Sequence, residues 1–304
     1  MLDFRSGTKG FTCPCARRPL KAGSWYTDDP AQLTSQLTAW LGEAQMSCGQ
    51  ARAIIAPHAG FAYSGPTAAW AYKHVVGDGV RRVFLLGPSH SMYSSRCLLS
   101  GCSAYATPMG SMDIDQQVYD ELAATGLFDE MSLAVDEKEH SLEMHLPFIL
   151  QAMGGRPFTL VPIMVGALSE ESESCYGKLL APYLADPQNF FVVSSDFCHW
   201  GERFNFVYQD PRHGAEIHQS VEALDRQGMA LIEAQDAAGF ASYLNRHGNT
   251  ICGRHPIAVL LHALQACTER QIGHQLKFVR YAQSSRCRRP HESSVSYASA
   301  VVWR

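Results

Sequence analysis

Four short runs of almost unbroken apolar residues constrain the fold of this chain more than any other feature. They are residues 51–57, 81–87, 158–166 and 189–195. A strand that is apolar at nearly every position has to be covered on both faces, as the inner strands of a parallel sheet are. Helix-like segments separate the runs. This alternation predicts an α/β fold in which helices flank a central, mostly parallel or mixed sheet.

Two further strand-like runs and several amphipathic segments complete the pattern. The runs are residues 276–282 and 294–303, and alternation in the second predicts a place near a sheet edge. We expect Asp113 to cap the first amphipathic helix, Pro147 to kink or split the second, and Gly228 either to break the third or to leave it whole. The predicted helices cover residues 113–126, 141–153, 213–235 and 255–269.

Composition narrows the class of protein. The 304 residues are 46% apolar and 18% charged, which is typical of a globular protein with a large core. We expect a single folded domain over residues 22–304, preceded by a flexible segment over residues 1–21. The net charge of -4 argues against a nucleic-acid partner. No apolar run approaches the roughly 18 residues of a membrane-spanning helix. With no signal-peptide pattern at the N-terminus, a cytoplasmic or nuclear protein is expected.

The ten cysteines do not form a recognisable framework. Cys13 and Cys15 make a C-x-C pair, and Cys97 and Cys102 make a C-x4-C pair, but neither has a second half at zinc-site spacing. In a long chain without an export signal, disulfides are not expected. We therefore predict reduced thiols, several of which fill core positions.

Three of the predicted strands end in a histidine. His58, His90 and His199 lie within four residues after the first, second and fourth apolar runs, in turns of small residues. Ligands of open α/β sheets bind beyond the carboxyl ends of the strands. Scattered core histidines would not choose the same end of the sheet, so these imidazoles are expected to face one crevice.

A fourth segment, NTICGRHP (249–256), adds Cys252 just before a predicted helix. His58, His90 and Cys252 would make a three-ligand metal site with open positions. Each residue also has a simpler interpretation. His58 alone would be a core histidine bonded to a carbonyl, His90 a turn cap, and Cys252 a small apolar side chain. The joint pattern favours the site, although no local motif specifies its geometry.

Other stretches offer supporting residues. In DEKEHSLEMHLPF (136–148), the side chains of His140, Glu143 and His145 either orient a ligating histidine or simply begin a helix after an acidic loop. Trp25 and Tyr63 either line a ligand cleft or pack in the core. The basic cluster at residues 286–290 either lies in a solvated loop or attracts a phosphorylated peptide.

Eight segments together resemble one known family. They are AGSWYT, ARAIIAPHAGFAYSGPTAAWAYK, LLGPSH, DEKEHSLEMHLPF, VPIMVGALSE, LADPQNFFVVSSDFCHWG, NTICGRHPIAVLL and YAQSS…SSVSYAS. From about residue 22 to the C-terminus, the chain is similar to the Memo family, mediators of cell motility driven by the ErbB2 receptor.

The resemblance implies a fold similar to the class III, non-haem-iron extradiol dioxygenases. It places the two histidine ligands at His58 and His90 and the acid/base histidine at His199. The third ligand falls on Cys252, where the dioxygenases have a glutamate. A thiolate is softer than a carboxylate, so this site suits copper as well as iron, and ring cleavage by the dioxygenase route is disfavoured.

The resemblance also implies two kinds of function. The first is a signalling protein that binds a phosphotyrosine peptide of a receptor tyrosine kinase or its adaptor and relays the signal to the cytoskeleton. Trp25, Tyr63, Asp196 and His199 would line the peptide cleft. The alternative is a copper- or iron-dependent oxidase or dioxygenase-like enzyme, with His199 moving protons. A zinc hydrolase is weaker, because no water-activating glutamate stands at a recognisable spacing.

Overall fold

One large sheet runs through the centre of the molecule. The computed structural model describes residues 15–210, 212 and 216–304, and within these residues nine strands join in that sheet. Eight follow the order β10-β12-β2-β9-β3-β8-β4-β7, and β11 also pairs with β12. The strands are β2 (Ala53–Ala56), β3 (Arg82–Pro88), β4 (Cys97–Ser100), β7 (Phe128–Met131), β8 (Thr159–Val165), β9 (Asn189–Ser194), β10 (His199–Trp200), β11 (Gln275–Gln283) and β12 (Ser294–Trp303).

The four apolar runs form the centre of the sheet, as the sequence predicts. Strands β2, β9, β3 and β8 are neighbours and run parallel, and nearly all of their residues are buried. Strands β12 and β4 flank them antiparallel, so the sheet is mixed. The α/β class with a central mixed sheet is therefore confirmed.

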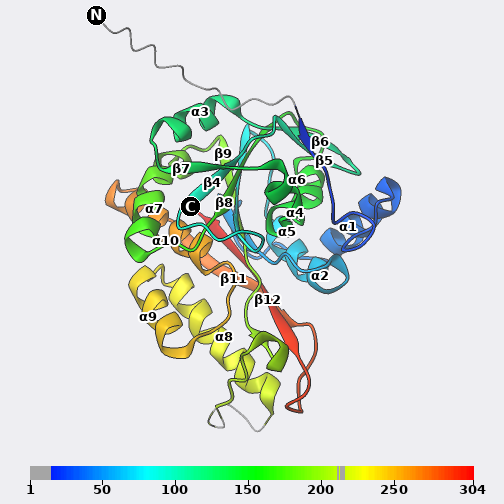
Figure 1. The fold of residues 1–304 in the computed structure, drawn as a ribbon, viewed down its shortest axis with the longest axis vertical. Coiled ribbons are helices and arrows are strands. Elements are labelled where there is room, and N and C mark those ends of the chain that lie inside the picture. Colours follow the sequence, from blue (N-terminus) through cyan, green and yellow to red (C-terminus); the bar gives the residue numbers. More distant parts are fainter. Residues whose placement is uncertain (1–14, 211, 213–215) are drawn as a thin grey trace, which may run out of the picture.

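Helices cover both faces of this sheet (Figure 1). Helices α7 and α10 pack together against β3 and β9, while α1, α2 and α6 form the other layer, in which α2 lies on β2 and β12. Helix α8 packs on β11 and on α9. The helices are α1 (Pro30–Glu43), α2 (Phe61–Tyr72), α3 (Gln116–Ala124), α4 (Leu133–Lys138), α5 (His140–Glu143), α6 (Leu146–Met153), α7 (Glu170–Ala185), α8 (Ile217–Glu233), α9 (Ala237–His247) and α10 (Arg254–Glu269), with a 3-10 turn η1 (Glu202–Phe204).

One detail of the predicted helices is confirmed and one is wrong. Pro147 does split its segment, since α5 and α6 are separate and Pro147 lies in the first turn of α6. Helix α10 likewise holds Pro256 in its first turn, where no intrahelical N–H bond is lost. Asp113 is not a helix cap, because it is the last residue of strand β6 (Gly110–Asp113). The carboxylate that caps α3 belongs to Asp115, which accepts from Val118 N.

Helix α8 continues unbroken through Gly228, and residues 213–215 of the predicted segment lie outside the described residues. The glycine serves packing rather than a break. A Cβ at this position would lie 2.9 Å from Cε1 of Tyr243, so its absence lets α9 approach α8 closely.

The prediction that residues 294–303 lie near a sheet edge is confirmed by the strand order, because only β10 and β11 lie outside β12. Strand β12 has β2 on one side and β11 and β10 on the other, and nine of its ten residues are buried. Its polar positions are serines, which are small enough to be covered. The hydroxyl of Ser299, for example, donates to the carbonyl of Thr67 in α2 at 2.7 Å.

The folded part of the chain begins before residue 22. Strand β1 (Ala16–Arg17) pairs with β5 (Ala104–Thr107), which pairs with β6 (Gly110–Asp113). Arg17 is fully buried and forms ion pairs with Asp136 and Glu143. The expected boundary at residue 22 is therefore too late, because these buried pairs hold residues 15–21 against the domain. The rest of the predicted flexible segment, residues 1–14, lies outside the described residues.

Two further findings concern the whole described chain. No helix in it combines the length and the apolar character needed to cross a membrane. Its cysteines, which include every one except Cys13, are all free thiols.

Candidate metal centre

The side chains of His58, His90 and Cys252 meet at one edge of the sheet. His58 follows β2, His90 follows β3, and Cys252 immediately precedes α10. One ligand atom from each lies within 4.8 Å of the other two. Cys252 Sγ is 3.2 Å from His58 Nε2, and the two imidazole centres are 5.2 Å apart. Three distant segments of the chain thus present two nitrogens and one sulfur to a common point.

The loop that carries Cys252 reaches this point because Gly253 has no side chain. Gly253 N donates to Ser195 Oγ at 3.1 Å, just after the end of β9. A Cβ on Gly253 would lie 2.4 Å from the carbonyl oxygen of Ser194. The close contact brings the sulfur beside the histidine that follows the neighbouring strand.

His58 is oriented by hydrogen bonds on its far side. Its Nδ1 lies 2.6 Å from Ser194 Oγ, whose own hydroxyl hydrogen is donated to the carbonyl of Ser141. Ser194 therefore accepts from Nδ1–H, which leaves Nε2 of His58 as a lone-pair donor facing Cys252. Burial, followed by the charge of His90, lowers the pKa of His58 well below its usual value. A neutral imidazole is the form that binds a metal.

Glu139 orients His90. Its carboxylate lies 2.9 Å from His90 Nδ1 and accepts from the backbone N–H of His90 at 2.6 Å. Burial alone would raise the pKa of Glu139, but the hydrogen bond and charge of His90 and the charge of His140 outweigh it and lower this pKa to about 2. The carboxylate is thus ionised and holds the Nδ1 hydrogen, so that Nε2 of His90 is available to a metal.

We predict that Glu139→Gln lowers metal affinity by roughly 10- to 100-fold, the usual cost of losing a carboxylate behind a ligating histidine. The amide nitrogen of glutamine would face N–H donors that the carboxylate now satisfies. Competition with a chelator of known affinity measures the change. Glu137→Gln is the matched control, since Glu137 pairs with the exposed Arg18 instead. Equal affinities for the two variants would contradict the role of Glu139.

Cys252 is held as a thiol until a cation arrives. Burial, followed by the negative charge of Asp196, raises the pKa of the Cys252 thiol. Its sulfur accepts from the backbone N–H of Asp196 at 3.3 Å. A bound cation would displace the proton, because metal binding to cysteine releases it. Two imidazoles and one thiol that can be deprotonated are a donor set that fits copper, iron or zinc.

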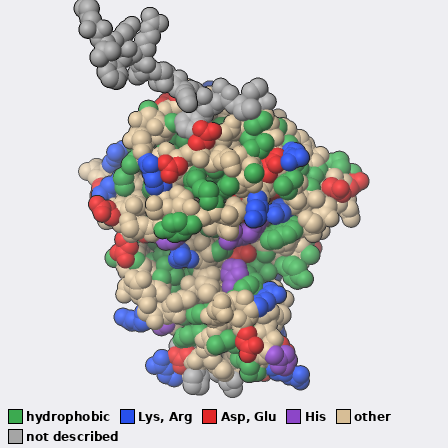
Figure 2. Space-filling model, viewed as in Figure 1, with side chains coloured by type: hydrophobic (Ala, Val, Ile, Leu, Met, Phe, Trp, Pro, Cys, Tyr) green, Lys and Arg blue, Asp and Glu red, His purple; other side chains and the backbone are tan. Residues whose placement is uncertain are grey.

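A pocket of about 540 Å³ opens beside the two histidines. The aromatic rings of Trp25 and Tyr63 are 37% and 64% exposed. Histidine side chains gather near the middle of the face shown in Figure 2. The residues that line the pocket are Ser24, Trp25, His58, Ala59, Gly60, Ala62, Tyr63, His90, His140, Asp196, His199, Phe204 and Val295.

His199 presents a free ring nitrogen to this pocket. Its Nδ1 lies 3.0 Å from the carbonyl oxygen of Thr250, and its backbone N–H donates to Thr250 Oγ1 at 2.7 Å. A carbonyl can only accept, so Nδ1 carries the hydrogen and Nε2 keeps its lone pair. His199 is therefore positioned to take a proton from a ligand in the pocket.

Comparison with known proteins identifies the family. Residues 17–301 match the family described as "Memo-like protein". This chain belongs to the Memo family. It is 52% identical over 288 residues to Protein MEMO1 of Danio rerio, and 51% identical over 288 residues to Protein MEMO1 of Homo sapiens, covering 94% of this chain and 97% of each relative. It is 44% identical over 302 residues to the Protein memo-1 homolog of Caenorhabditis elegans, covering 99% of this chain and 86% of that protein.

A solved structure, an uncharacterized protein of Escherichia coli K12, superposes with a TM-score of 0.48 at 13% identity. The match covers 81% of this chain and 98% of that protein.

His140, Glu143 and His145 were expected to orient a ligating histidine, but in the structure they do not share one location. The ring of His140 lies in the pocket itself, 4.4 Å from that of His90 and 5.3 Å from that of His58. Glu143 accepts from Tyr26 Oη and pairs with Arg17. His145 Nδ1 bonds to Tyr72 Oη at 2.9 Å. Glu143 and His145 thus bond to other groups than the three candidate ligands.

The predicted pocket residues Trp25, Tyr63, Asp196 and His199 all line one pocket with His58 and His90. Sequence analysis did not predict the three residues that bond to the Nδ1 atoms of the histidines, which are Glu139, Ser194 and Thr250. Glu139 directly precedes His140, but nothing in its spacing shows that its carboxylate turns back to His90.

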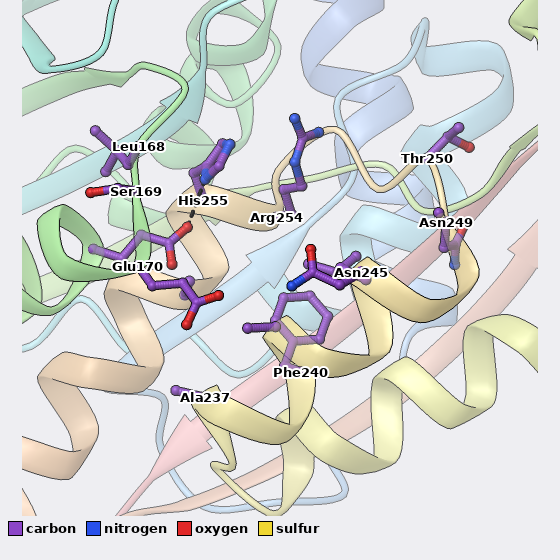
Figure 3. Close-up of a pocket in the computed structure, with 15 residues that line it drawn as sticks. Leu168, Ser169, Glu170, Ala237, Phe240, Asn245, Asn249, Thr250, Arg254 and His255 are labelled. Carbon is purple, nitrogen blue, oxygen red and sulfur yellow. Dashed lines mark hydrogen bonds and ion pairs between the residues drawn. The ribbon is translucent and has the colours of Figure 1, made fainter.

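Two residues in the first turn of α10 face a different pocket, shown in Figure 3. Arg254 and His255 line it together with residues of α7 and α9. His255 Nδ1 lies 2.6 Å from Glu173 Oε1. The histidine three residues after Cys252 is therefore held away from the metal centre.

A buried carboxylate forms hydrogen bonds with both the loop that carries His199 and the loop that carries Cys252. Asp225, on α8, accepts from the backbone N–H of Cys198 at 3.3 Å and from Asn249 Nδ2 at 3.0 Å. Cys198 precedes His199, and Asn249 begins the Cys252 loop. Burial raises the pKa of Asp225 to about 6, although hydrogen bonds from Ser296, Asn249 and Tyr281 oppose the rise.

This raised pKa predicts a pH dependence of stability. The folded state binds the Asp225 proton more tightly than the unfolded chain, so its contribution is fully present below the unfolded pKa, near 4, and is lost as pH rises through about 6. The free energy of unfolding of wild type relative to Asp225→Asn should fall by up to about 3 kcal/mol between pH 4 and pH 7. Urea unfolding at several pH values measures it. A difference that is constant or rises with pH would contradict the assignment.

Proposed function

We propose that this Memo-family protein is a signalling protein that holds one copper or iron ion between His58, His90 and Cys252. The observation that carries the proposal is the convergence of three ligand atoms, from three separate segments, within 4.8 Å of one another. The hydrogen bonds that the two Nδ1 atoms donate to Ser194 and Glu139 leave the facing Nε2 atoms free, which supports the same interpretation.

The donor set supports a redox-active metal. One thiolate and two imidazoles suit copper and iron, while the harder Mg²⁺ and Ca²⁺ prefer oxygen ligands. When bound, copper or iron would supply one-electron redox chemistry at the wall of the pocket. The residues around it have their own tasks: Trp25 and Tyr63 offer aromatic surface to a ligand, and His199 Nε2 accepts or returns a proton.

Metal titration tests this proposal. Purified protein, stripped with a chelator, is titrated separately with Cu(I), Cu(II), Fe(II) and Zn(II), and its metal content is measured after dialysis. We expect one copper or iron per chain and, with Cu(II), a sulfur-to-copper charge-transfer band. Anomalous scattering from a crystal should place the ion among the three ligands. No stable binding, or an ion elsewhere, would refute the site.

The signalling role rests on membership of the Memo family and on the pocket mouth. We propose that a phosphotyrosine peptide of a receptor tyrosine kinase or its adaptor binds there and that the complex acts on the cytoskeleton. Exposed Trp25 and Tyr63 suit stacking on an aromatic side chain. The ammonium group of Lys21 lies 5.7 Å from the centre of the Trp25 ring and offers a positive charge for the phosphate. A cytoplasmic and nuclear location fits this role.

A peptide titration tests the signalling role. Phosphorylated and unphosphorylated forms of the same receptor-tail peptide are titrated into metal-free and metal-loaded protein by calorimetry. Tighter binding of the phosphorylated form, weakened in Trp25→Ala, is expected. Equal binding of both forms, or none, would exclude the proposed partner.

The alternative is a copper- or iron-dependent oxidase or dioxygenase-like enzyme, favoured by the free Nε2 of His199 in the same pocket. Cleavage of aromatic rings is disfavoured, because a thiolate stands where a carboxylate is expected and is itself prone to oxidation. Oxygen consumption by metal-loaded wild type, lost in His199→Gln at unchanged metal content, would support an enzyme.

A further inference from the structure

We propose that Cys15 and Cys102 form a reversible disulfide that fastens the N-terminal arm, residues 15–21, to the rest of the domain. Their sulfur atoms lie 3.2 Å apart, although the residues are 87 positions apart in sequence. A disulfide bond is about 2.05 Å long, so a small movement of the two side chains would close it.

The backbone holds the two cysteines in place for this bond. Strand β1 pairs with β5 in the register Ala16 to Ala104, which sets Cys15 beside the residues just before β5. Ser103, the neighbour of Cys102, donates its backbone N–H to the carbonyl of Cys15 at 2.9 Å and its hydroxyl at 3.2 Å. Because Cys102 directly precedes Ser103 in the chain, these backbone contacts keep the two cysteines next to each other.

The two thiols differ in solvent exposure, and this difference sets the order in which they react with an oxidant. Cys15 is half-buried, whereas Cys102 is 2% exposed. Burial is the main reason that the pKa of Cys102 rises to about 12. Cys15 is therefore the thiol that reacts first with a reagent from solvent, and Cys102 resolves the product.

A low-molecular-weight disulfide such as oxidised glutathione serves as the oxidant. The Cys15 thiolate attacks one of its sulfurs, and one glutathione thiolate leaves. Cys102 then loses its proton and attacks the Cys15 sulfur of the mixed disulfide, and the second glutathione leaves. The two protein thiols are oxidised by two electrons, and both protons end on two glutathione thiols. Excess reduced glutathione reverses the sequence.

The bond would control an arm that carries a buried charge. Arg17, two residues after Cys15, pairs with Asp136 and Glu143 inside the protein. In the reduced state the arm is held by these pairs and by the short β1 strand. In the oxidised state it is also held covalently, which removes the open-arm conformations in which Arg17 leaves the interior.

Disulfide mapping of the full-length protein tests the proposal. The protein is equilibrated in buffers of increasing oxidised-to-reduced glutathione ratio, alkylated, digested and analysed by mass spectrometry. We expect a peptide that links Cys15 to Cys102, while the exposed Cys175 is found only as a thiol or a glutathione adduct. Alkylation of both Cys15 and Cys102 at every ratio, or a link through Cys13 instead, would overturn the proposal.

Stability and proteolysis supply the second measurement. Oxidation should raise Tm by about 5 °C or more and slow tryptic cleavage after the partly exposed Lys21 at the end of the arm. Both effects should persist in Cys13→Ser and vanish in Cys15→Ser, which changes a half-buried thiol and avoids the buried Cys102. Effects of the same size in Cys15→Ser would contradict the assignment.

Discussion

Replacing Cys252 with serine is expected to lower the affinity for copper or iron by more than the roughly 10- to 100-fold that follows loss of a supporting residue. Serine keeps a small polar side chain, but its hydroxyl does not ionise as a thiol does when it meets a soft cation. His58 and His90 would remain as only two ligands. Chelator competition measures the change, and the sulfur-to-copper band should disappear.

Cys267→Ser is the matched control for this variant. Cys267 is buried and lies on α10, the helix that Cys252 precedes, where its sulfur contacts the carbonyl of Ala181. Any general cost of exchanging a thiol for a hydroxyl appears in both variants, whereas metal loss should appear in Cys252→Ser alone. Unchanged metal content in Cys252→Ser would remove the basis of the proposed site.

Replacing Arg17 with methionine is expected to lower the free energy of unfolding by about 3–5 kcal/mol, the usual cost of leaving buried charges without their partner. Arg17 lies 3.2 Å from Asp136 Oδ1 and 3.0 Å from Glu143 Oε2, and all three side chains are fully buried. It also donates to the carbonyl of Glu139 at 2.7 Å. Methionine fills part of the volume but offers no positive charge. Denaturant unfolding measures the loss.

The neighbouring arginine provides the control. Arg18 pairs with Glu137, but its side chain is 71% exposed. Its replacement by methionine should lower the free energy of unfolding far less than the replacement of Arg17 does, because solvent screens an exposed pair. Adding Glu143→Gln to Arg17→Met should recover part of the loss, since one of the uncompensated charges is then gone. Equal losses for the two arginine variants would show that the buried pairs do not stabilise the fold as argued.

The sequence predicted the centre of the fold well because the central strands are apolar on both faces. An unbroken apolar run fits few positions in a globular protein besides the inner strands of a sheet, which helices cover on both faces. Strands β2, β3, β8 and β9 lie at such positions. Their parallel direction puts the residues after them at one edge, which is why His58 and His90 were predicted to meet.

Short and partly polar elements were not predicted. Strands β4 and β7 have four residues each, too few for a periodic signal. The burial of β12 was not predicted, because serines look like solvent-facing residues in a pattern, whereas here they are buried and bonded. Helix α2 contains Gly65 and Pro66, which hide its helical character in the sequence.

The candidate metal centre likewise contains residues that the sequence predicts and one that it does not. His58, His90, His199 and Cys252 are placed by strand ends and a helix start, which are local features that a sequence carries. Glu139 carries no such mark, because its role depends on where α5 packs against the end of β3.

By itself, the sequence determined the α/β class, the central strands, the family and the residue types that gather at the edge of the sheet, because periodicity and chain direction are local properties. Only the tertiary structure decided the order of the strands, the burial of Arg17 among carboxylates, the approach of Cys15 to Cys102 and the hydrogen bonds that orient each imidazole. These depend on distances between segments far apart in the chain, and such distances are set by packing.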